Sequence, residues 1–198
     1  VISTDSLIIT VATGADITIA GSTSGDQPLE FITAGAGGVT LDGGTQALAG
    51  IFDSDSSFGG RLVISNAGTK TFAEAIGGAN RHGTVTTNSG ATAVFDTTLA
   101  TTTLVNTGTT TLTGAFTGTT INNAGTLTAT AAIDGVSGLT TINMTTQASA
   151  MTFNATGATD LDMVVATATD GFGTLNFIDS ADNTAAANTL SGGDIGAT

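Results

Sequence analysis

The chain has no cysteine, tryptophan or tyrosine, one proline, and only 3 Lys or Arg residues against 16 Asp or Glu in 198 residues. The lack of cysteine excludes disulfide bonds and cysteine-ligated zinc. Arg61, Lys70 and Arg81 are too few to build a surface for nucleic-acid phosphates, and a net charge of −13 opposes contact with an acidic membrane surface. No apolar run of about 18 residues occurs, so we expect no membrane insertion by this segment.

What the chain does have is glycine, threonine and small apolar residues. There are 28 glycines, and hydrophobic residues make up 40% of the chain while charged residues make up 10%. That balance is typical of a folded protein rather than a disordered one. Abundant Thr, Val, Ile and Ala with few aromatic residues favour flat strands that stack closely.

A short phrase, Asn-x-Gly, recurs four times in the middle of the chain. The repeated turns are Asn66 to Gly68, Asn88 to Gly90, Asn106 to Gly108 and Asn123 to Gly125. Their glycines are 22, 18 and 17 residues apart. Gly adopts positive φ at no steric cost and Asn tolerates the left-handed region, so each phrase predicts a turn between two strands.

Apolar residues return at even offsets from these turns, and even offsets share one face of an extended chain. The predicted core residues are Ile64, Phe72, Ile76, Val94, Leu104, Leu112, Phe116, Ile121 and Ile133. A unit this short cannot bury its apolar side alone, so each must stack on the next. The pattern predicts an all-β fold, a parallel β-helix (β-solenoid) with coils of roughly 17–24 residues.

We predict a single solenoid over residues 1–198. Residues 1–60 form irregular N-terminal coils, 61–133 carry the regular repeats, and 134–198 form irregular C-terminal coils and a tail. Atypical terminal coils are expected, because they shield the open ends of the stack.

Two acidic stretches are candidate calcium sites. Asp53, Asp55 and Ser57 match the opening of a calcium loop, but Ile64 stands where the bidentate Glu should be. Asp160 and Asp162 alternate in the same way. The competing interpretation for both is a polar surface loop. We expect no cofactor, with calcium as the one alternative.

Glu74 and Asp96 are the candidate catalytic carboxylates. Both lie six residues after their repeat glycine, a parity that would turn them inward on adjacent coils, which resembles the arrangement in β-helical polysaccharide hydrolases. A bulge or corner that turns them outward is the favoured interpretation. His82, the only histidine, stands in an insertion and is expected on a solvent-exposed loop. We therefore expect no enzyme, and keep a polysaccharide-binding or polysaccharide-cleaving β-helix as an alternative.

Threonine forms the most orderly predicted surface. Thr69, Thr71, Thr109, Thr111, Thr126 and Thr128 stand at odd, outward offsets, interrupted at Ala91 and Ala93. Such a ladder resembles the ice-binding face of β-solenoid antifreeze proteins, although Thr is also simply a good exposed strand residue.

The segments 106–116 and 121–128 resemble repeats in autotransporter passengers and other large bacterial surface adhesins. The resemblance implies a right-handed parallel β-helix exported to the cell surface, acting as a stalk, adhesin or matrix component, and it supplies no catalytic residues. A solenoid has open ends with unpaired backbone groups, so we predict head-to-tail self-association. The residues expected at the junction are Leu7, Ile9, Val11, Leu175 and Phe177. A carbohydrate or cell-surface ligand is the other partner considered.

Overall fold

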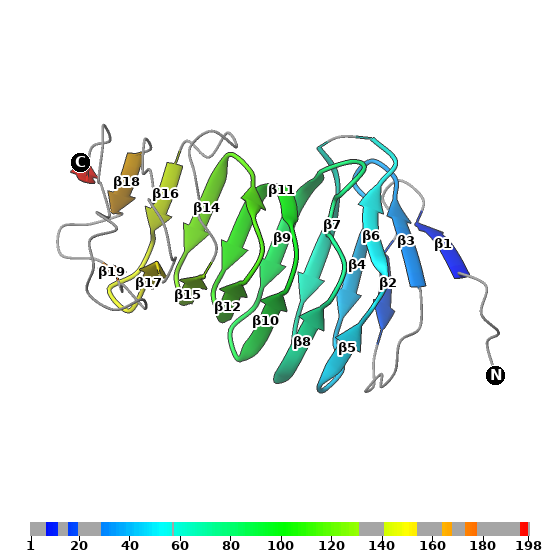
Figure 1. Ribbon diagram of the computed structural model, residues 1–198, viewed down its shortest axis with the longest axis horizontal. Coiled ribbons are helices and arrows are strands. Elements are labelled where there is room, and N and C mark those ends of the chain that lie inside the picture. Colours follow the sequence, from blue (N-terminus) through cyan, green and yellow to red (C-terminus); the bar gives the residue numbers. More distant parts are fainter. Residues whose placement is uncertain are drawn as a thin grey trace, which may run out of the picture.

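The chain folds as a β-solenoid in which parallel strands stack along one long axis (Figure 1). The computed structural model describes residues 7–11, 16–19, 29–56, 58–130, 141–153, 164–167, 173–177 and 195–197. Within these ranges every regular element is a strand, and no helix is long and apolar enough to cross a membrane. The strands from β3 to β15 make about five turns. The predicted all-β parallel solenoid is thus confirmed, while its right-handed winding stays a prediction.

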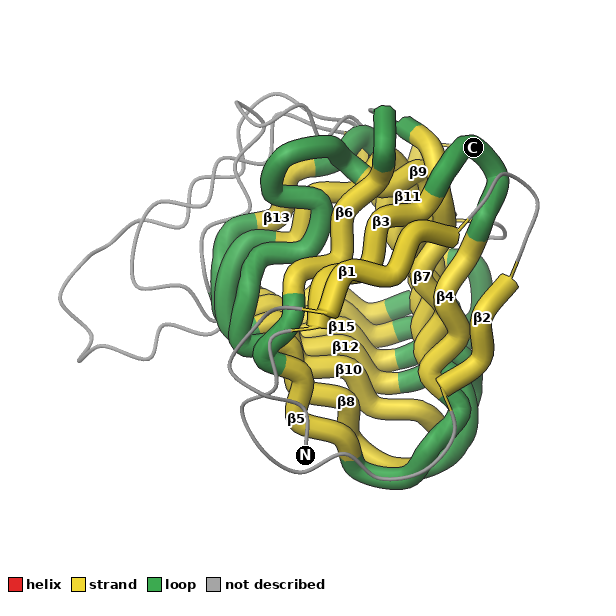
Figure 2. Tube along the Cα trace, turned by 90° about the vertical axis from the view of Figure 1, so that its right-hand side faces the viewer, coloured by secondary structure: helices red, strands yellow, loops and turns green. Residues whose placement is uncertain are grey.

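Each coil has three sides that enclose the core, as the view along the stack shows (Figure 2). The first side contains β1 (Leu7–Val11), β3 (Leu29–Thr33), β6 (Ile51–Ser54) and β13 (Phe116–Thr117), linked through Ile76 and the start of β11. The second side contains, in order, β2 (Asp16–Ile19), β4 (Gly38–Leu41), β7 (Gly59–Ile64), β9 (His82–Thr87), β11 (Leu99–Asn106), β14 (Thr120–Asn123), β16 (Thr141–Met144), β18 (Val164–Thr167) and β20 (Ile195–Ala197). The third side contains β5 (Gln46–Leu48), β8 (Gly68–Phe72), β10 (Ala91–Phe95), β12 (Thr109–Leu112), β15 (Thr126–Ala129), β17 (Ala150–Phe153) and β19 (Thr174–Phe177).

The coil length varies while the strand register stays in step. Residues at the same register position are 23 apart from Ile64 to Thr87, 17 apart from Leu112 to Ala129, and 24 apart from Ala129 to Phe153. The predicted range of roughly 17–24 residues holds from β1 to β19, whereas the last described step, from Val165 to Ile195, is 30 residues long. Extra residues therefore lie in the corners between sides, not in the strands.

The core is a set of inward columns, one residue from each coil. The predicted core residues Ile64, Phe72, Ile76, Leu104, Leu112, Phe116 and Ile121 are all buried. Ile133 lies outside the described residues. Near the N-terminal end the core is aromatic: the rings of Phe31 and Phe52 stack at 4.9 Å, and those of Phe72 and Phe95 at 4.8 Å. Offset stacking of this kind adds to the burial of the rings.

Core side chains shrink where the coils are short. In the column on the third side, Phe95 is followed by Leu112 and Ala129, the two coils reached by 17-residue steps, and then by Phe153 after a 24-residue step. A shorter coil encloses less volume, and interiors are filled to near-constant density. Coil length and core residue size therefore change together.

Val94 was predicted in the core, and this prediction is wrong. Val94 is half-exposed on the outer face, while Ala93 and Phe95 are buried. The reason is register: Gly68 pairs with Ala91, the residue after the repeat glycine of that coil. A shift of one residue moves every side chain of a strand to the opposite face.

Asn106 and Asn123 form a buried ladder at the corner between the second and third sides. The Asn106 amide nitrogen donates to the Asn123 Oδ1 at 2.8 Å and to the Thr126 carbonyl at 2.9 Å. The Asn123 amide nitrogen donates to the Ala150 carbonyl at 2.9 Å, and Thr110 donates to the Asn106 Oδ1 at 3.0 Å. The two side chains thus satisfy backbone groups that the turn leaves unpaired.

The other two predicted turn asparagines, Asn66 and Asn88, do not occupy the buried corner position. Asn66 is exposed with φ 65, and its Oδ1 accepts from the Ala67 amide at 2.8 Å. Asn88 is half-buried, because Thr87 takes the inward position in that coil. The four phrases are alike in sequence, but only two occupy the same structural position.

The repeat glycines are needed for two reasons. Gly68 and Gly90 have positive φ, as the turn chemistry predicted. A Cβ on Gly125 would instead collide with the Gly108 carbonyl of the coil below, and one on Gly108 would collide with the Asn88 carbonyl. In the short coils glycine is required because the turns of successive coils stack in contact.

Candidate functional site

The third side carries two columns rich in threonine on its outer face, interrupted at Val94, Ala150 and Asn176. Pairing aligns Thr69, Thr92, Thr109, Thr126, Ala150 and Thr174 in one column, and Thr71, Val94, Thr111, Thr128, Thr152 and Asn176 in the other. This coil was predicted to interrupt the array at Ala91 and Ala93, but both are buried. Thr92 and Val94 take the outward places, so the interruption lies at Val94 and affects one column. The two columns stand about 6.7 Å apart along the strands, and successive threonines about 4.8 Å apart across them.

The candidate calcium ligands do not form a cluster. Asp53 is buried and its Oδ1 accepts from the Ala79 amide at 3.3 Å, whereas Asp55 is exposed and its Oδ1 accepts from the Gly35 amide at 3.3 Å. Among the described residues no group of three or more His, Cys, Asp or Glu could hold a metal ion. Ser57, Asp160 and Asp162 lie outside those residues. The two carboxylates each accept from a backbone amide of a neighbouring coil.

Glu74 and Asp96 both point to solvent in the corner after the third side. They do not share a register position, because the Asp96 amide bonds to the Phe72 carbonyl and Asp96 therefore stacks on Ala73. The outward interpretation is therefore correct.

His82 was expected on an exposed loop, and this is wrong. It begins β9 with 1% of its surface exposed, and its Nε2 donates to the Phe52 carbonyl at 3.0 Å. Its Nδ1 is buried without a hydrogen-bond partner. Burial lowers the pKa of His82, an effect partly offset by the Phe52 carbonyl and the Asp53 carboxylate.

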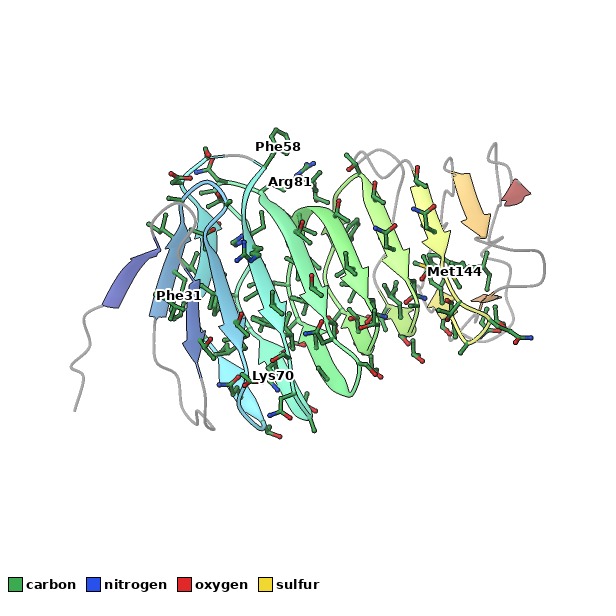
Figure 3. All side chains as sticks on the ribbon, turned by 180° about the vertical axis from the view of Figure 1, so that it is seen from behind. Phe31, Phe58, Lys70, Arg81 and Met144 are labelled. Atoms are coloured by element: carbon green, nitrogen blue, oxygen red, sulfur yellow. The ribbon has the colours of Figure 1, made fainter. Side chains whose placement is uncertain are left out.

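Lys70 is a buried lysine that sequence patterning missed. Its side chain is buried at the corner between the second and third sides (Figure 3). The ammonium donates to the carbonyls of Gly43 at 2.6 Å and Ser65 at 3.0 Å, and makes longer hydrogen bonds to two further carbonyls of the same turn. Burial lowers the pKa of Lys70, and Asp42 opposes this. The ammonium binds carbonyls of a tight turn from the inside, so its role there is structural.

The two ends of the solenoid expose strand edges. Within the described ranges β2 pairs only with β4, and β20 only with β18, at opposite ends of the second side. On the third side the outermost strands are β5 and β19. Ile17 in β2 and Leu175 in β19 are partly buried against the core.

The predicted junction residues fall on two different sides. Leu7, Ile9 and Val11 belong to β1 on the first side, and Leu175 and Phe177 to β19 on the third. They lie toward opposite ends of the stack, and their part in self-association stays a prediction.

Comparison with protein-family models, curated protein sequences and solved structures finds no match for this chain. The architecture itself is that of a repetitive β-helix protein.

Proposed function

We propose that this chain is a non-catalytic extracellular structural protein: a building block of a bacterial cell-surface filament, layer or adhesin stalk that associates head to tail. The observation that carries the proposal is that, among the residues the structure describes, no further strand pairs with the outer edges of β2 and β20, which terminate one continuous parallel sheet. An open edge is a template for another strand. The repeat resemblance to autotransporter passengers and large surface adhesins supports the same role.

Strand polarity defines the geometry of the junction. All pairings between coils are parallel, so the two ends present different surfaces, and a second copy can continue the stack only head to tail. In that arrangement β20 of one copy pairs with β2 of the next. The apolar end around Ile17 is then buried.

Assembly is tested by electron microscopy and light scattering of the purified chain, with calcium and with a chelator. Ile17→Asp places a charge in the end surface and should abolish filaments. Thr103→Asp, on the outer face of the second side, is the matched control and should leave them intact. Monomeric rods at high concentration in both conditions would overturn the proposal. Loss of filaments in chelator alone would place calcium at the junction.

A second candidate function is favoured by the threonine array. We infer that the regular two-column face of the third side can order water and bind an ice surface. Four successive coils, with Thr69, Thr92, Thr109 and Thr126, supply threonine without a gap. Thermal hysteresis should be measurable and should be lost in Thr109→Tyr, but kept in Thr103→Tyr on the second side. No hysteresis in the wild type would exclude this function and leave the structural one untouched.

A further inference from the structure

Phe58 is held in a conformation and an environment that both cost free energy. Its φ is 73 and its side chain is 64% exposed. A bulky residue in the left-handed region is an outlier, and such strain persists mainly where a function uses it. The ring stands at the rim of the solenoid beside Arg81, whose guanidinium carbon lies 5.8 Å from the ring centroid (Figure 3).

The backbone around Phe58 and Arg81, here called the Phe58 rim, is fixed by hydrogen bonds to neighbouring coils. The Phe58 amide donates to the Arg81 carbonyl at 2.9 Å, and the Ser54 amide to the Asn80 carbonyl at 3.4 Å. The Arg61 guanidinium donates to the Ala36 carbonyl at 2.7 Å. Ring and guanidinium groups are thus presented in a preset arrangement, which lowers the entropy cost of binding.

Two shallow hollows adjoin the Phe58 rim and share Phe58. One, of about 530 Å³, is lined by Phe58, Arg61 and the glycines around them, and the other, of about 340 Å³, by Phe58, Arg81 and Thr98. Four glycines line the first hollow and two line the second, so backbone polar groups are within reach of a ligand. Two consecutive hollows with one shared wall suit consecutive units of a linear chain.

The positive charges at the Phe58 rim indicate a ligand that carries negative charge. Arg61 and Arg81 line the hollows, and with the buried Lys70 they are all the lysine and arginine of the chain. A guanidinium matches a carboxylate in bidentate geometry, and an aromatic face matches the flat C–H face of a sugar ring. Asp55 lies beside the first hollow, where its Oδ1 accepts from the Gly35 amide.

We propose that the Phe58 rim is a binding site for a linear saccharide with one carboxylate on each ring, a polyuronate. The ring of Phe58 stacks against a sugar face at the junction of the two hollows, and Arg81 binds a carboxylate. Arg61, which is held by the Ala36 carbonyl, adds positive charge to the first hollow. The remaining negative charge of the protein is screened beyond about 8 Å at physiological salt, so it does not prevent local binding. The rim lies on the side of the rod, and binding does not depend on head-to-tail assembly.

The test is calorimetric titration with an oligogalacturonate of about six units, beside its methyl ester, which keeps the rings and loses the charge. We expect the acid to bind and the ester to bind at least about tenfold more weakly. Arg81→Gln should weaken binding of the acid similarly. Ile51→Ala is the matched control, because Ile51 is the other exposed large apolar residue among those described and lines neither hollow.

Phe58→Gly separates binding from folding. Glycine adopts φ 73 without strain, so this variant should melt no lower than the wild type while losing binding by about tenfold or more. Equal affinity of Phe58→Gly and wild type, equal affinity for acid and ester, or no binding of the acid would each overturn the proposal.

Discussion

Replacing Asn123 by alanine should be among the most damaging single changes in the regular coils. Asn123 has no exposed surface, accepts from Asn106 at 2.8 Å and donates to the Ala150 carbonyl at 2.9 Å. Each bond contributes about 1 kcal/mol net, and the orphaned buried carbonyl adds a desolvation cost of about 1–2 kcal/mol. We expect the free energy of unfolding to fall by about 3 kcal/mol.

Asn122 is the matched control because it precedes Asn123 and points to the opposite face. It is half-buried and its Oδ1 accepts from Asn143 at 2.7 Å, a bond that water can replace. Asn122→Ala should cost about 0.5 kcal/mol. Asn123→Thr should recover part of the loss, since Thr87 occupies the same column and bonds Thr110 at 3.0 Å.

The assay is urea unfolding followed by far-ultraviolet circular dichroism, because the chain lacks tryptophan and tyrosine as fluorophores. Midpoints are compared among variants, since a solenoid can unfold in more than one step. If Asn123→Ala unfolds within about 0.5 kcal/mol of the wild type, or no earlier than Asn122→Ala, the ladder does not stabilise the corner.

Three further predictions concern pH, turn stacking and register. Burial lowers the pKa of His82 in the folded state, so as the pH falls the unfolded chain takes up the proton first, and stability is kept above about pH 6.5 and falls below it. His82→Gln should therefore lose less of its urea midpoint than the wild type between about pH 7.5 and 5. An equal loss of midpoint in the two proteins would contradict this. Gly125→Ala should destabilise by more than about 3 kcal/mol, because its Cβ meets the backbone of the coil below, whereas Gly90→Ala, with positive φ and open space, should cost about 1 kcal/mol in the same assay. A smaller cost at Gly125, whose φ is not positive, than at Gly90 would show that φ matters and the stacking contact does not. Ala93→Asp should prevent folding, as judged by loss of the β-sheet dichroism, while Val94→Asp should be tolerated, and the reverse outcome would restore the original parity.

The fold could be predicted because the turn phrase and the apolar positions around it recur in every regular coil, even though the coils differ in length. Even-offset residues such as Leu104, Leu112 and Ile121 are buried wherever the phrase and the register coincide. The register of β10 could not be predicted in the same way. One extra residue before Ala91 leaves the local sequence looking like its neighbours, yet it inverts the faces of the strand.

Polar residues inside the solenoid were missed for a related reason. Lys residues are usually exposed and His residues are less often buried than apolar ones, so Lys70 and His82 were not predicted to be buried. The backbone carbonyl that bonds each most closely comes from a residue distant in sequence and meets it only in the folded chain. A signal for Lys70 was present, because it lies two residues before Phe72 on the inward parity. Phe58, by contrast, has no periodic context, and its exposure and left-handed backbone depend on contacts with the next coil.

The alternation of long and short coils on an unbroken register has a consequence for how such a chain can change over generations. A corner can gain or lose several residues, as between the 17- and 24-residue steps, without displacing the columns above and below it. Single corners can therefore gain new loops while the stacked strands of the other coils stay unchanged. Recognition can diversify at the corners while the strands keep the register and direction of the stack.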